Sequence, residues 1–162
     1  MVQKRKQRTA DEAPVPGARI LVVEARFYSA IADELLAGAL ARLNAAQVEV
    51  DTIQVPGALE IPIAALIAVD AAAKTGKPYD GLVALGCVIR GETSHYDIVA
   101  GESARGLMDL ALARSLPVGN GILTVDKEKQ AIVRASRKRD DKGGGAASAA
   151  LALVRIARAR GK

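Results

Sequence analysis

One pattern along the chain constrains its fold more than any other. Strand-like segments, at residues 20–24, 48–55, 81–89 and 118–125, alternate with segments of helical periodicity, and the first of them contains the continuous apolar run Ile20 to Val23. Continuous apolar runs of this kind are typical of strands buried on both faces of a parallel sheet. Strands that alternate with helices form βαβ units with right-handed crossovers. The sequence therefore predicts an α/β protein, a three-layer α/β/α domain around a four-stranded parallel sheet.

The helices are predicted from apolar residues that recur three and four positions apart. This spacing indicates helices at residues 29–43, 61–73, 96–116, 127–134 and 145–159. Pro117 ends the third helix, because proline cannot continue a helical hydrogen-bond ladder. Gly143, Gly144 and Gly145 predict a flexible start for the last helix, since glycine has the largest backbone freedom to lose.

The composition indicates one folded domain and a short arm. The chain has 162 residues, of which 50% are hydrophobic and 25% charged, as expected for a single compact domain at residues 18–162. Residues 1–17 hold charges and two prolines without periodicity, and we expect a flexible basic arm there. No apolar run has the length of a membrane span or forms the apolar core of a signal peptide. We therefore expect a cytoplasmic protein that does not bind membranes.

Two further classes of protein are disfavoured. The single Cys87 and the single His95 cannot form an intrachain disulfide or a tetrahedral zinc site within one subunit, so no metal is expected. The net charge of +5 suggests nucleic-acid binding, but residues 1–8 and 155–162 carry four positive charges each, which leaves a mildly acidic body. Aromatic residues make up only 2% of the chain and offer little surface for base stacking. We expect no nucleic-acid partner.

Candidate site residues follow the predicted strands, because ligands of open parallel sheets bind beyond the carboxyl ends of the strands. The segment Gly91 to His95 leads into a helix, where free amides could hold a phosphate, or where a hydroxyl could merely cap the helix. His95, the single imidazole of the chain, is either a proton shuttle or an inert surface residue. Phe27 could stack on a planar ring or belong to the core. Glu60 could bind hydroxyls or be an ordinary first-turn carboxylate.

Taken together, these segments resemble the lumazine synthase family. The resemblance covers roughly residues 19–155. Its motifs are VPGALEIP at 55–62, LGCVIRGETSHYD at 85–97 and GILTV at 121–125, with further matches at 130–135 and 142–143. The resemblance implies a flavodoxin-like fold and formation of 6,7-dimethyl-8-ribityllumazine, the penultimate step of riboflavin biosynthesis. The implied substrates are 5-amino-6-(D-ribitylamino)uracil and 3,4-dihydroxy-2-butanone 4-phosphate, with release of phosphate and water and without a cofactor.

The resemblance also assigns site residues. It implies that His95 is catalytic and shuttles protons, that Phe27 stacks on the pyrimidinedione ring and that Arg134 helps to bind the phosphate. The substrate-binding residues that it implies are Phe27, Ala58, Leu59, Glu60, Val88, Ile89, Gly91, Glu92, Thr93, Asn120, Arg134 and Lys142. In the family each site is shared, so Asn120, Arg134 and Lys142 would come from the neighbouring subunit of a homo-oligomer.

Family members form either pentamers or sixty-subunit capsids, and the sequence favours the pentamer. In the capsid-forming members the turn between the last two helices is short, small and contains glycine. Here residues 136–141 read SRKRDD, with three consecutive cations that would have to be desolvated at a capsid contact. Three alternatives remain open: a non-catalytic flavin- or lumazine-binding protein on the same scaffold, a nucleic-acid-associated protein that uses its basic ends, and a structural shell protein.

Overall fold

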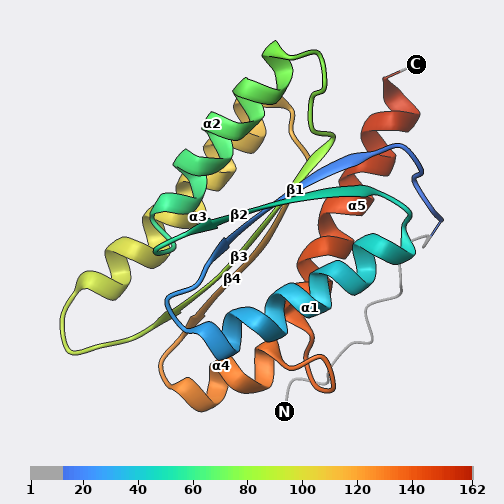
Figure 1. Ribbon diagram of the computed structural model, residues 1–162. Helices are drawn as coiled ribbons and strands as arrows, with labels where there is room; N and C mark the ends of the chain where they lie inside the picture. The colour runs from blue at the N-terminus through green and yellow to red at the C-terminus, as the bar shows by residue number, and fades with distance from the viewer. Residues whose placement is uncertain (1–12, 162) are drawn as a thin grey trace.

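The computed structural model describes residues 13–161 of the chain (Figure 1). Its elements follow the order β1 (Arg19–Ala25), α1 (Ser29–Ala45), β2 (Glu49–Val55), α2 (Glu60–Lys74), β3 (Gly81–Ile89), α3 (His95–Arg114), β4 (Val118–Val125), α4 (Glu128–Ala135) and α5 (Lys142–Arg160). Every strand and helix predicted from periodicity is present within a few residues of its expected bounds. In the part of the chain that is described, no helix is both long and apolar enough to cross a membrane.

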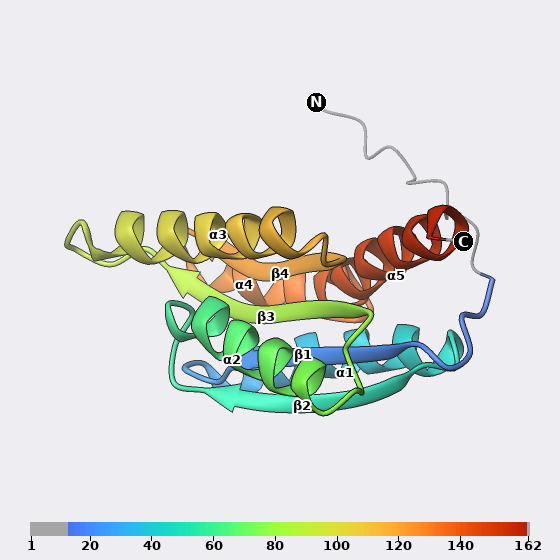
Figure 2. The same cartoon turned by 90° about the horizontal axis from the view of Figure 1, so that it is seen from above.

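The four strands form one sheet in the order β2-β1-β3-β4, and all neighbouring strands are parallel. Helices α2 and α3 cover one face of the sheet, while α1, α4 and α5 cover the other (Figure 2). The predicted three-layer α/β/α fold is therefore confirmed. The strand order is flavodoxin-like, and the order reverses between β1 and β3, which is where ligands of such sheets bind.

The core consists of two apolar clusters, one on each face of the sheet. Successive side chains of a strand point to opposite faces. In β1, Ile20 and Val22 accordingly pack with α1 and α5, while Leu21 and Val23 pack with α2. This double burial explains why β1 reads as a continuous apolar run.

The start of α5 differs from the sequence prediction. The helix begins at Lys142 and not at residue 145, and the carboxylate of Asp141 caps it by accepting a hydrogen bond from the Gly144 amide. Gly143 and Gly144 are buried, and a Cβ atom on Gly143 would overlap with the Leu35 carbonyl oxygen of α1. The prediction of a flexible start is wrong, because these glycines allow α5 to pack tightly against α1.

Residues 13–17 were expected within the flexible arm, and in the structure they contact the domain. Val15 is buried, and its amide donates to the carbonyl oxygen of Ala46 at 2.9 Å. The guanidinium groups of Arg155 and Arg158 donate to the carbonyl oxygens of Ala13 and Pro16. The four cations predicted in the arm lie outside the described residues. Two of the cations at the carboxyl end thus hold the segment that precedes β1.

Candidate active site

Two loops meet at the point where the strand order reverses. Strands β1 and β3 are neighbours, with Glu24 paired in register with Leu85, so their carboxyl ends lie at the same edge of the sheet. Phe27 follows β1, and the predicted phosphate loop, residues 91–94, follows β3. The fold therefore brings Phe27 and the predicted phosphate loop to one edge, as expected from the topology.

Phe27 lies outside the core. Its side chain is 74% exposed. Its ring packs edge-to-face against the ring of Tyr28, at a centroid distance of 5.0 Å. The alternative that Phe27 packs in the core is thus wrong. An exposed aromatic ring at the ligand-binding edge of a sheet provides a face on which a planar ligand can stack.

The phosphate loop precedes α3, a helix of 20 residues. Ser94 is the N-cap residue of α3 but makes no side-chain cap hydrogen bond, and Thr93 Oγ1 accepts from the His95 amide only at 3.4 Å. Gly91, Glu92, Thr93 and His95 are all exposed. The first amides of a helix have no partner within it and form the positive end of its dipole. The loop therefore presents backbone donors that could bind an anion.

Arg90 fastens this loop, a role that the sequence did not indicate. Its Nε donates to Asp126 at 3.1 Å, its guanidinium lies 3.4 Å from Asp97, and it stacks on the Tyr96 ring at 4.1 Å. The hydrogen bond to Asp126 raises the pKa of Arg90, and the negative charge of Asp97 adds to this effect. Arg90 thus ties the phosphate loop to the end of β4 and to the first turn of α3.

The residues expected to bind the ribityl chain and the ring lie near the ends of β2 and β3. Ala58 is buried, whereas Leu59 and Glu60 are exposed at the start of α2. Val88 is buried toward α2, and Ile89 packs against the cluster on the opposite face. The side chains of Val88 and Ile89 therefore cannot both face one ligand, and one of them can contact a ring only through its backbone.

The three remaining predicted residues gather at another place. Asn120, Arg134 and Lys142 line a pocket of about 370 Å³ between the edge strand β4, α4 and α5. Arg134 donates to the Gln130 carbonyl oxygen at 3.2 Å, and Asn120 Oδ1 accepts from the Ile122 amide at 2.9 Å. Within residues 13–161 neither Arg134 nor Lys142 has a carboxylate at ion-pair distance, so this pocket holds two cations without a counter-charge.

Comparison with known proteins supports the resemblance found in the motifs. A family model described as 6,7-dimethyl-8-ribityllumazine synthase matches residues 17–158. The chain belongs to this family. A relative with that name from Azorhizobium caulinodans is 64% identical and covers 98% of both chains. Relatives with the same name from Xanthobacter autotrophicus and Methylobacterium radiotolerans are 62% and 61% identical, and cover 98% and 92% of both chains.

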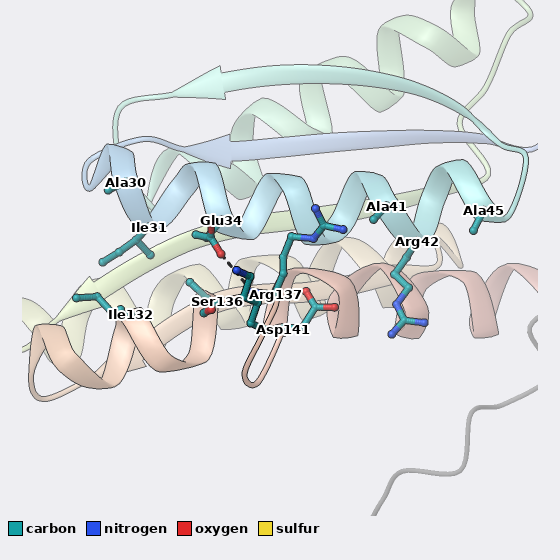
Figure 3. A pocket seen from close by; sticks show the side chains of 12 residues that line it. Ala30, Ile31, Glu34, Ala41, Arg42, Ala45, Ile132, Ser136, Arg137 and Asp141 are labelled. Atoms are coloured by element: carbon teal, nitrogen blue, oxygen red, sulfur yellow. Dashed lines mark hydrogen bonds between the residues drawn. The ribbon is translucent and has the colours of Figure 1, made fainter.

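A larger hollow contains none of the substrate-binding or catalytic residues that the lumazine synthase resemblance implies. This hollow, of about 1030 Å³, lies between α1 and the turn that joins α4 to α5 (Figure 3). Its two acids are engaged, because Glu34 accepts a hydrogen bond from the Arg137 amide at 3.2 Å and Asp141 caps α5. The residues of the candidate site therefore do not line this hollow.

Cys87 is unsuited to nucleophilic catalysis. Burial raises the pKa of its thiol to about 11, with a smaller contribution from the negative charge of Glu128. The thiol is thus protonated at neutral pH, where only a thiolate would be reactive. Among residues 13–161 no group of three or more histidine, cysteine, aspartate or glutamate side chains could hold a metal ion.

Proposed function

We propose that this protein condenses 5-amino-6-(D-ribitylamino)uracil with 3,4-dihydroxy-2-butanone 4-phosphate in the cytoplasm, and forms 6,7-dimethyl-8-ribityllumazine, phosphate and water. The observation that carries the proposal is the membership of nearly the whole chain in the lumazine synthase family. The geometry is in keeping with it, because an exposed ring, a helix N-terminus and a lone histidine lie at one edge of the sheet.

In this proposal each group performs a step suited to its chemistry. Phe27 stacks on the pyrimidinedione ring, and Glu60 accepts hydrogen bonds from ribityl hydroxyls. The loop amides of Gly91 to Thr93 bind the phosphate of the second substrate. The 5-amino group of the first substrate attacks the ketone of the second, one water leaves, and phosphate is then eliminated. The ribitylamino nitrogen next attacks the remaining carbonyl, and loss of a second water closes the ring. His95 takes up and returns the protons of these steps, since an imidazole can do both near neutral pH.

The distribution of charge supports a site shared between two subunits. Arg90, the cation beside the phosphate loop, is already paired with Asp97 and Asp126. Arg134 and Lys142 have no described carboxylate partner, but they line the separate pocket beside β4. We propose that this pocket of one subunit faces the phosphate loop of its neighbour. A phosphate bound between them would then receive two cations that a single chain does not supply at that loop.

We propose a homopentamer as the assembly. Large apolar side chains are exposed on α2 and α3, where Ile63 and Ile67 as well as Met108 and Leu112 are each one helical turn apart. An exposed apolar surface of this kind is typical of an interface. A closed ring with identical contacts lets every subunit complete the site of its neighbour. Arg137, Lys138 and Arg139 are exposed on the turn after α4 and disfavour a further contact there.

The proposed activity is tested by mixing the purified protein with both substrates. The expected result is the absorbance and fluorescence of the lumazine product, together with one phosphate per product molecule. A protein that binds the lumazine but makes none from the two substrates would instead be a non-catalytic binding protein, the principal alternative. Arg134 and His95 would then have no role in turnover.

We expect Arg134→Ala to weaken binding of the phosphorylated substrate much more than binding of the ribitylaminouracil. A guanidinium pairs with phosphate oxygens through charge-assisted hydrogen bonds, each contributing about 1.5–3 kcal/mol. The apparent KM for the butanone phosphate should therefore rise about tenfold or more, and that for the uracil should change little. Arg114→Ala is a suitable control, since Arg114 pairs with Asp70 on the surface. Equal losses for both substrates would indicate a general structural role for Arg134.

We expect light scattering at moderate salt to give the mass of a pentamer of 16.8 kDa subunits. A particle of megadalton mass would contradict the pentamer and favour a capsid. An active monomer would contradict the shared site itself, because one chain would then suffice for turnover.

A further inference from the structure

A buried carboxylate lies directly beneath the turn that carries Phe27. Glu24, the penultimate residue of β1, has a relative exposure of 0%. Among residues 13–161 the other buried polar side chain is Ser103, whose hydroxyl bonds to its own helix. Removing an ionised carboxylate from water is costly, and replacing such pairs by apolar residues is often neutral or stabilising. Stability alone therefore does not explain the presence of Glu24.

The contacts of Glu24 link the ends of two strands. Its Oε2 accepts from Arg26 at 3.0 Å, and its Oε1 accepts from the Gln54 side chain of β2 at 3.1 Å. The other end of the Arg26 guanidinium donates to Asp33 in α1. Arg26 therefore spans from the end of β1 to the second turn of α1, and Phe27 lies within the segment that this bridge encloses.

Phe27 needs such a support because packing does not supply one. Its ring is largely exposed and packs edge-to-face against the ring of Tyr28. The direction of the ring therefore depends on the backbone of the turn. That backbone is held by the Arg26 amide, which donates to Val55, and by the Ala32 amide, which donates to Tyr28. Glu24 fixes the side chain of Arg26 and thereby restrains the backbone of this turn.

We propose that Glu24 is a positioning residue that holds Arg26 and thereby presents Phe27 to the ring of the uracil substrate. This inference rests on the proposed function for the identity of the ring. The predicted effect of Glu24 on the mobility of the turn is independent of that function, because it can be measured without a substrate.

The first test is hydrogen exchange in Glu24→Gln, which keeps the size of the side chain and removes its charge. The amides of Arg26 and Ala32 should exchange about tenfold faster than in the wild type, as expected for a turn that opens more often. Asp51→Asn is the matched control, because Asp51 is a carboxylate at the opposite end of the sheet, paired with Arg19 and Tyr79. Unchanged exchange at Arg26 and Ala32 in Glu24→Gln would overturn the proposal.

The second test is kinetic. Glu24→Gln should raise the KM for the ribitylaminouracil about tenfold, because a stacking contact with its ring is lost. The KM for the butanone phosphate should change less than about twofold. In a Phe27→Leu background Glu24→Gln should have no further effect, because its action passes through the ring. Effects that multiply in the double variant, or equal changes in both KM values, would overturn the proposal.

If Glu24→Gln does not fold, Arg26→Lys tests whether the bridge from Glu24 to Asp33 positions Phe27. It keeps a positive charge beside the buried carboxylate but cannot bridge to Asp33 with the same geometry. It should show the same faster exchange and the same selective rise in KM, and wild-type values for both would overturn the proposal. If the wild type forms no lumazine, the proposed function fails, while the exchange measurement still shows whether Glu24 holds the turn.

Discussion

Replacing His95 with alanine should lower kcat about 10²- to 10⁴-fold and leave the fold intact. General acid-base catalysis by a positioned side chain contributes a factor of this size, and the binding of both substrates remains. His95 is exposed at the first position of α3, so its removal leaves no cavity in the core. The measurement is steady-state turnover between about pH 6 and 8, a range around the reference pKa of histidine.

Glu102→Ala is the control for this variant, because Glu102 is exposed on the same helix and paired with Arg105. It should retain the wild-type kcat. Turnover by His95→Ala that equals the wild type at every pH would contradict the proton-shuttle role. A loss of helical circular dichroism in His95→Ala would instead indicate that the residue is needed for folding.

Replacing Gly143 with alanine should lower the free energy of unfolding by about 3 kcal/mol, the upper end of the usual cost of overpacking. A Cβ atom at this position would overlap with backbone atoms of Leu35, and backbone cannot move aside as a flexible side chain can. To accept the methyl group, α5 would have to separate from α1 along one of the principal helix contacts of the fold. Urea unfolding of the purified protein measures the change.

Gly145→Ala provides a control within the same helix. Gly145 is exposed, and a Cβ atom there would meet no atom within 4 Å. Alanine stabilises exposed helix interiors by up to about 1 kcal/mol relative to glycine, so this variant should be slightly more stable than the wild type. Equal effects of the two substitutions would show that backbone freedom, and not the contact with α1, determines the role of Gly143.

Periodicity predicted the elements because it reports burial, and burial is a local property of each residue. The run at residues 20–24 indicated a strand covered on both faces, and α1 and α2 do cover it. The same reasoning failed at the start of α5. The run of three glycines led us to predict flexibility at Gly143. Its structural role instead depends on close packing against Leu35, a residue more than a hundred positions away.

The family was predictable from the motifs, whereas the arrangement of the candidate site residues was less so. Motif resemblance singled out Phe27, His95 and Arg134, but no local pattern shows that Arg134 lines a separate pocket beside the edge strand β4. The sequence also gave no reason to single out Glu24, because its significance depends on contacts with Gln54 and Arg26. Pairings of this kind across the sheet are determined by the tertiary structure alone.

The side-chain hydrogen bond within the edge strand β4 has a consequence for the solubility of the single chain. An edge strand presents unpaired amides that can template pairing with strands of other chains, a common route to aggregation. In β4 the side chain of Asn120 accepts from the outward-facing amide of Ile122. This bond satisfies one donor at the exposed edge and makes extension of the sheet by a foreign strand less favourable. Asn120 thus helps to keep single chains from joining edge to edge.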